Sequence, residues 1–284
     1  MEEKSVSTIS NENIQLNICA QSGFITSLSI RERSLFKQPL RPNYYRAMVD
    51  NDRGFASFNP KQLLSTIEGF QWKHVPDEMR LIDTKIKDVD ANIVVTSRYE
   101  HKLFEGDIVL EYTVHPNGRL KIKHAATPLQ RPYRIGMSAV LTEGYCNFTW
   151  YGRGPHENYC DRKTSADVAV YHGGLDDLQH NYLRPQENGN RTDVRYLNIR
   201  DAYGSGFTIQ DCTSRHFGFS VHPYSQNELD ECEHIHDLPC HDEVYLQIDA
   251  LQCGVGGDLP GIALLKKGYY IEEGKTYEQE FEIF

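Results

Sequence analysis

The feature that most constrains the fold is a long succession of short apolar segments separated by residues typical of turns. Gln21-Ser22-Gly23 and Pro116-Asn117-Gly118 each lie between two such segments and predict β-hairpins. The expected strands are residues 14–19, 24–30, 93–99, 108–114, 120–124, 135–141, 148–150, 168–171, 194–199, 206–210, 217–221, 245–251, 263–265 and 279–284. This pattern predicts an all-β protein built as a large antiparallel sandwich.

Two short helices are expected to interrupt the strands. Asn59 as cap and Pro60 at the first position predict a helix that covers a sheet and stops at Gly69. Ser225, with Glu228 three residues on, predicts a capping box for a second helix at about residues 226–236. The chain has no internal repeat, linker or break in composition. We therefore expect one domain over residues 13–284, preceded by a disordered or tag-like stretch at 1–12.

Composition and charge exclude several classes of function. The formal net charge of −10 argues against nucleic acid, which needs a basic face, and weakly against anionic membranes. No segment approaches the roughly 20 apolar residues of a membrane span, and residues 1–12 do not resemble a secretory signal. The seven cysteines are scattered and never form a Cys-x-x-Cys pair. Free thiols in a reducing cytoplasm are the simplest explanation.

The stretch from 151 to 162 reads Tyr-Gly-Arg-Gly-Pro-His-Glu-Asn-Tyr-Cys-Asp-Arg and concentrates polar side chains around a bend. Gly152 and Gly154 argue against a strand interior because they suit a positive φ or a close backbone approach, and Pro155 stiffens the turn. A catalytic role and buried turn architecture both remain open for this stretch, with turn architecture favoured.

Other candidates for chemistry are less specific. A retaining glycosidase needs two carboxylates about 5–5.5 Å apart, and Glu157, Glu187 and Glu231 are candidates that spacing alone cannot pair. The segment 232–241 has the composition of zinc ligands, but its spacing matches no common zinc pattern. We favour a polar helix-to-loop transition there and no metal. Tyr245 precedes alternating apolar residues, so it is either a core aromatic or a ring presented to a sugar.

Several stretches together resemble the C-terminal domain of the bacterial β-galactosidases of glycoside hydrolase family 2, which is a separate small subunit in some organisms. The matching runs are Gln-Ser-Gly-Phe at 21–24, Arg-Ala-Met-Val-Asp-Asn-Asp-Arg-Gly at 46–54, the whole stretch 151–162, Pro-Gln-Glu-Asn-Gly at 185–189, Tyr-Ser-Gln at 224–226, Ile-Asp at 248–249 and Gly-Val-Gly-Gly-Asp at 254–258. They occur in the family's order and cover nearly the whole chain from about residue 12.

This resemblance implies a galactose mutarotase-like supersandwich that packs beside a catalytic (β/α)₈ barrel and closes part of its galactoside pocket. Both catalytic glutamates and the Mg²⁺ and Na⁺ sites of the family lie in the barrel, so no catalytic residue or cofactor is expected in this chain. The implied partner is a β-galactosidase large chain, and this chain alone should not hydrolyse lactose. Self-association stays open.

Two site features follow from the resemblance. The run from Tyr224 to Asp249 places Tyr245 where the family usually has a tryptophan platform for the leaving sugar, and a phenol offers less stacking area than an indole. The family's mobile rim loop corresponds to residues 54–59, with Gly54 as hinge and Ser57 as a residue that switches hydrogen bonds. A plain turn entering the following helix is the alternative for this loop.

The resemblance also implies a structural role for the bend residues Gly152, Gly154, Pro155, Glu157, Asn158, Asp161 and Arg162. Two other functions remain open. One is a free-standing aldose 1-epimerase that uses a histidine as acid and a glutamate as base. The other is a carbohydrate-binding or purely structural module.

Overall fold

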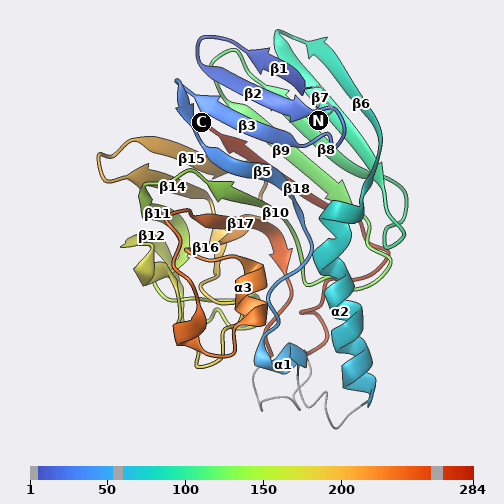
Figure 1. Ribbon diagram of the computed structural model, residues 1–284, viewed down its shortest axis with the longest axis vertical. Coiled ribbons are helices and arrows are strands. Elements are labelled where there is room, and N and C mark those ends of the chain that lie inside the picture. Colours follow the sequence, from blue (N-terminus) through green and yellow to red (C-terminus); the bar gives the residue numbers. More distant parts are fainter. Residues whose placement is uncertain (1–5, 54–59, 257–264) are drawn as a thin grey trace.

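The computed structural model describes residues 6–53, 60–256 and 265–284, without the side chains of residues 60–67. In it the chain forms two antiparallel nine-stranded sheets (Figure 1). The first sheet has the order β1-β2-β3-β5-β10-β17-β16-β13, with β4 paired to β3. Its strands are β1 Val6–Ser10, β2 Ile14–Cys19, β3 Ile25–Ile30, β4 Arg33–Ser34, β5 Phe36–Asn43, β10 Arg134–Leu141, β13 Arg191–Val194, β16 Phe217–His222 and β17 Tyr245–Gln252.

The second sheet has the order β12-β11-β14-β15-β18-β9-β8-β7-β6. Its strands are β6 Arg80–Val89, β7 Asn92–Glu100, β8 Ile108–Val114, β9 Leu120–Ala126, β11 Tyr145–Gly154, β12 Asp167–Gly174, β14 Tyr196–Asp201, β15 Gly206–Asp211 and β18 Tyr277–Ile283. The helices are α1 Asp50–Arg53, α2 Pro60–Glu78 and α3 Gln226–Glu231, and single turns of 3₁₀ helix span Asp176–Leu178 and Ile235–Asp237. The expected all-β sandwich is confirmed.

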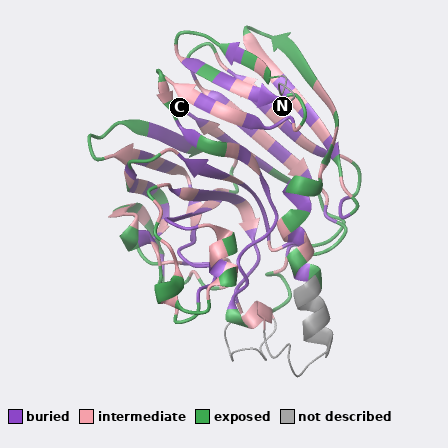
Figure 2. Cartoon of the chain, in the orientation of Figure 1, coloured by how far each residue is buried: buried purple, intermediate pink, exposed green. Residues whose placement is uncertain are grey.

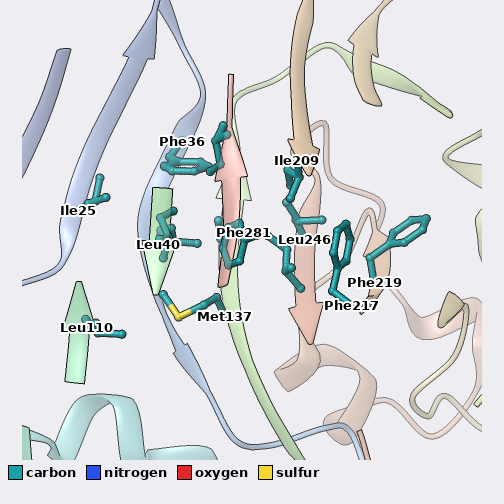
Figure 3. Close-up of a cluster of buried hydrophobic side chains, with 14 of the residues drawn as sticks. Ile25, Phe36, Leu40, Leu110, Met137, Ile209, Phe217, Phe219, Leu246 and Phe281 are labelled. Carbon is teal, nitrogen blue, oxygen red and sulfur yellow. The ribbon is translucent and has the colours of Figure 1, made fainter. Parts of the chain in front are cut away.

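The core lies between the two sheets. Strands with one buried face alternate strictly, as in β8 and β9, whereas the edge strand β6 is largely exposed (Figure 2). In Figure 3, Leu40, Met137 and Leu246 of the first sheet lie close to Ile209 and Phe281 of the second. Side chains from both inner faces therefore fill one continuous apolar layer.

The N-terminal boundary differs from the expectation. Residues 6–10 form β1, which pairs with β2 over its whole length, so the sandwich includes part of the stretch expected to be disordered. Ile9 is buried there, and the Thr8 hydroxyl donates a hydrogen bond to Asn17 Oδ1 at 2.8 Å. These contacts stabilise the edge strand.

The helix predicted to start at Pro60 is α2, and it is longer than predicted: it continues through Gly69 to Glu78. A Cβ at Gly69 would lie 2.3 Å from the Tyr133 hydroxyl oxygen and 2.9 Å from Met48 Cε. Close packing of α2 against Tyr133 and Met48 thus explains why this helical position is a glycine. In the part of α2 that follows Gly69, the side chains of Trp72 and Val75 are buried. The second helix is shorter than predicted, since α3 ends at Glu231, although its capping box at Ser225 is confirmed.

The glycines at 152 and 154 lie inside β11, so the prediction that they could not occupy a strand was wrong. A Cβ at Gly152 would meet Val194 Cα at 2.9 Å, and one at Gly154 would meet Tyr171 Cδ2 at 2.8 Å. The close approach of β13 to Gly152 and of the Tyr171 ring of β12 to Gly154 requires glycine at both positions. The bend begins at Pro155, which follows a cis peptide bond. The strand expected at 263–265 falls almost entirely outside the described residues.

Candidate functional site

Tyr245 is the first residue of β17 and lies between Val140 of β10 and His222 of β16. Its side chain is half-buried, whereas Leu246 next to it is buried in the core. The His241 ring lies 5.9 Å from the Tyr245 ring, tilted by 53°. The ring is therefore not sealed inside the sandwich, and its role as a sugar platform stays a prediction.

The environment of Tyr245 is polar and acidic. Partial burial, and then the nearby Glu228 and Glu243, raise the pKa of its phenol, so the hydroxyl is neutral at neutral pH. His241 contacts Glu228, with 2.8 Å between Nε2 and Oε1. Burial opposes ionisation of Glu228, but hydrogen bonds from Ser225 and the contact with His241 lower the pKa of that carboxyl. The capping box of α3 thus holds the histidine beside the candidate platform.

Helix α3 also holds α1, through Asp230. The Tyr45 hydroxyl donates to Asp230 at 2.9 Å, and Lys73 Nζ lies 3.0 Å from the same carboxylate. Arg53 Nη2 lies 3.6 Å from Asp230. Helix α3 therefore contacts both the surroundings of Tyr245 and Arg53, the last residue of α1. Gly54, Ser57 and the rest of 54–59 lie outside the described residues, and their predicted roles are untested.

Helix α1 lies near the far end of β17 from Tyr245. Buried Arg46 binds Asp52 through Nε and Nη2 at 3.1 and 2.9 Å and donates to the carbonyl oxygens of Cys253 and Gly254. Asn51 donates to the carbonyl of Val255 at 2.8 Å. Since residues 253–255 directly follow β17, these bonds attach α1 and the residues before it to the end of β17 opposite Tyr245.

The bend residues bind other parts of the chain. Glu157 accepts hydrogen bonds from Arg162, from the Tyr182 hydroxyl and, at 2.8 Å, from the amide of Gly189. Asn158 is fully buried and accepts from Thr192 N at 2.9 Å.

Asp161 completes this set by accepting from the amides of Val255 and Gly256 at 3.1 and 2.8 Å. Together these bonds join the bend to the segments after Pro185 and after β17. The purely structural role of the bend remains a prediction.

Four of the sequence runs quoted above converge on one small cavity of about 180 Å³ beside α1. Its lining residues are Val49, Asp50, Asn51, Tyr159, Arg162, Tyr182, Gln186, Glu187, Val255 and Gly256. Glu187 is buried and binds Arg134 Nη2 at 2.6 Å. Sequence reasoning missed the place of Tyr182, which no motif marks.

Glu157 and Glu187 each form an ion pair with an arginine of this chain, Glu157 with Arg162 and Glu187 with Arg134. Glu231 is exposed at the end of α3. The three do not form an open pair of carboxylates suited to glycoside cleavage.

The segment with zinc-ligand composition is a helix end followed by a 3₁₀ turn, as favoured from the sequence. His234 and His236 lie 3.2 and 3.6 Å from oxygens of Asp237, and all three are exposed. His241 is bound to Glu228 instead. Metal binding by this turn is untested.

Among solved structures, the fold resembles a galactose mutarotase-like protein from Lactobacillus casei (TM-score 0.51, 11% identity, covering 98% of this chain and 99% of that one). A galactose mutarotase related enzyme from Lactobacillus acidophilus has a TM-score of 0.50 at 10% identity, covering 98% and 96%. These likenesses define a mutarotase-like β-sandwich and show the fold alone.

Sequence relatives are more specific. The profile described as "Beta galactosidase small chain" matches residues 10–283, so the chain belongs to the β-galactosidase small chain family. The β-galactosidase of Priestia megaterium is 29% identical over 97% of this chain and 26% of its own length. That of Vibrio cholerae is 30% identical over 87% of this chain and 24% of its own length. The chain thus spans about a quarter of these relatives.

Proposed function

We propose that this chain is the non-catalytic small chain, or the C-terminal domain, of a β-galactosidase and that it completes the rim of the galactoside site on a barrel-bearing large chain. The half-buried ring of Tyr245 at the start of β17 is the observation that carries this proposal. Family membership and coverage of about a quarter of the relatives support it, since the rest of such an enzyme must supply the chemistry.

In this proposal the large chain supplies the acid and nucleophile of a retaining hydrolysis. It also holds the Mg²⁺ and Na⁺, and no cofactor belongs to this chain. Tyr245 stacks on the leaving sugar of lactose, and the loop 54–59, with Gly54 and Ser57, belongs to the rim. None of the seven cysteines, all of which lie in the described residues, forms a disulfide, which suits a reducing cytoplasm. No helix among the described residues is long and apolar enough to span a membrane.

The experiment that tests the proposal compares Tyr245→Ala with wild type, each in complex with the large chain. Loss of an aromatic stacking partner should raise KM for lactose about three- to tenfold, since stacking contributes about 0.5–1.5 kcal/mol. Tyr245→Trp should lower KM or leave it unchanged. Tyr203→Ala is the matched control, because Tyr203 is 95% exposed in the β14–β15 turn. Equal KM values for Tyr245→Ala and wild type would show that Tyr245 does not bind the leaving sugar.

A further inference from the structure

A second cavity, of about 630 Å³, opens where turns of the two sheets face each other. The β3–β4 turn of the first sheet forms one wall, and the β8–β9 and β14–β15 turns with Phe284 form the other. The side-chain Nδ2 atoms of Asn11 and Asn13 both donate to the Pro116 carbonyl oxygen and join the walls. Gly118 permits this approach, since a Cβ there would lie 2.7 Å from Asn13 Cβ.

The lining of this cavity is strongly basic in a chain whose net charge is −10. It contains Arg31, Arg33, Arg119 and Arg200 and no aspartate or glutamate. Even with one negative charge from a carboxylate at Phe284, the four arginines would leave the lining with a net positive charge. The field inside the cavity therefore attracts anions.

Two of the four arginines are paired with carboxylates that are not part of the lining. Arg33 Nη2 lies 2.8 Å from Asp201, and Arg119 Nη1 lies 2.9 Å from Glu282. The remaining two, Arg31 and Arg200, carry the uncompensated charge.

Arg200 is held rigidly by neutral partners. Its Nη1 donates to the carbonyl oxygens of Ile199 and Phe207, and its Nη2 donates to the Thr208 hydroxyl at 3.2 Å. Burial, with a smaller contribution from nearby Arg33, lowers the pKa of its guanidinium. An anion in the cavity would relieve this cost by supplying the missing counter-charge.

Arg31 lies in a two-residue turn between β3 and β4, where it and Glu32 have φ of +49° and +67°. Such turns favour Asn-Gly, so arginine occupies an unfavourable left-handed position. Its amide donates to the Asn13 carbonyl at 2.9 Å. Among the described residues its guanidinium has no hydrogen-bond or ion-pair partner. The guanidinium of Arg31 is therefore available to a ligand of the cavity that it lines.

We propose that this cavity binds a small molecule bearing a phosphate or sulfate group, held by Arg31 and Arg200. Planar guanidinium forks match the oxygens of a tetrahedral oxyanion, and the volume lies within the roughly 300–1,000 Å³ of ligand pockets. The oxyanion can come from a free inorganic ion or from a phosphorylated sugar. This site is independent of the galactoside rim.

The test is calorimetric titration of the full chain with inorganic phosphate, glucose 6-phosphate and neutral glucose. Saturable binding of at least one phosphate probe, weakened by added salt, is expected. If glucose 6-phosphate binds more tightly than inorganic phosphate, the ligand is a phosphorylated sugar; equal or weaker binding indicates the free ion. Glucose should not bind.

Arg31→Gln and Arg200→Gln should each weaken phosphate binding about tenfold, because each removes a charge-assisted hydrogen bond. Arg80→Gln is the control, since Arg80 is exposed on β6 and pairs with Glu100. Arg31 is exposed in a turn, so its variant tests the site even if Arg200→Gln does not fold. Absence of saturable binding by both phosphate probes, or wild-type affinity in Arg31→Gln, would overturn the proposal.

Discussion

At the scale of single residues, the interior of the sandwich contains an unusual amount of charge. Arg134 is fully buried between Glu187 and Asp249, with 2.6 Å to the first and 3.7 Å from its Nε to the second. Neither carboxylate oxygen of Asp249 accepts a hydrogen bond in the described residues. Burial raises the pKa of Asp249 to about 7, although Arg134 opposes this shift. The cluster therefore depends strongly on its ion pair.

Removing one member of that pair should be costly. Glu187→Gln keeps the shape but leaves the Arg134 charge without its close partner, so the free energy of unfolding should fall by about 3–5 kcal/mol. Glu100→Gln, which breaks an exposed pair with Arg80, should change it by less than about 1 kcal/mol. Urea unfolding monitored by fluorescence measures both. Similar small losses in the two variants would show that the buried pair contributes little.

Two buried histidines make the fold sensitive to acid. Burial lowers the pKa of His124 and of His222 to about 4, below the roughly 6.5 of an unfolded histidine. The unfolded chain therefore binds more protons between about pH 6.5 and pH 4, and the free energy of unfolding should fall as pH falls through that window. Chemical unfolding across this range checks the direction. A rise in stability toward acid would contradict neutral burial of these rings.

Asp249 should act with the opposite sign. Its pKa of about 7 lies above the usual 3.8 of an aspartate in an unfolded chain, so the stability it contributes is full below about pH 4 and is lost as pH rises through 7. In Asp249→Asn this loss is absent. The gain in free energy of unfolding from about pH 5 to about pH 7 should thus be larger in the variant than in wild type. Identical gains would mean that Asp249 does not titrate in this range.

At the scale of elements, turn chemistry predicted the hairpins well, because the residues that decide a turn are adjacent in sequence. The bounds of β2 and β8 match the predicted segments, and the capping box of α3 was found from Ser225 and Glu228. Gly69 misled the prediction of α2, since its reason is the Tyr133 ring more than 60 positions away. A contact at that separation leaves no local signal.

The packing account of α2 can be tested directly. In an exposed helix Gly→Ala stabilises by about 1 kcal/mol, but Gly69→Ala would place its Cβ 2.3 Å from the Tyr133 hydroxyl oxygen. We expect a loss of about 1–3 kcal/mol. In the background Tyr133→Ala, which removes the ring, the same substitution should be neutral or stabilising. A stabilising effect of Gly69→Ala in wild type would refute this explanation of the long helix.

At the scale of the whole molecule, the sequence predicted the fold class and the family but not the arrangement of the site. Tyr245 was identified through resemblance, and its partial exposure could not be derived from the alternation that follows it. The links through Asp230 join residues about 180 positions apart, such as Tyr45, and depend on the closed sandwich. The basic cavity likewise forms only when three distant turns meet.

An alternative for the whole molecule is an aldose 1-epimerase. The candidate acid is His222, which interacts electrostatically with Glu187. However, its side chain is buried, at 3% exposed, and its Nε2 lies 3.1 Å from the Asn188 carbonyl oxygen. The purified chain should therefore not accelerate the interconversion of α- and β-galactose in a polarimeter. Acceleration that is lost in His222→Gln would favour the epimerase and contradict the small-chain account.

The most direct measurement is lactose hydrolysis by the purified chain, by a cognate barrel-bearing large chain and by their mixture. The account predicts activity in the mixture that greatly exceeds the sum of the two chains alone, with none from this chain. Lactose hydrolysis by this chain without a partner would contradict it, as would a large chain whose activity and mass do not change when the two are mixed.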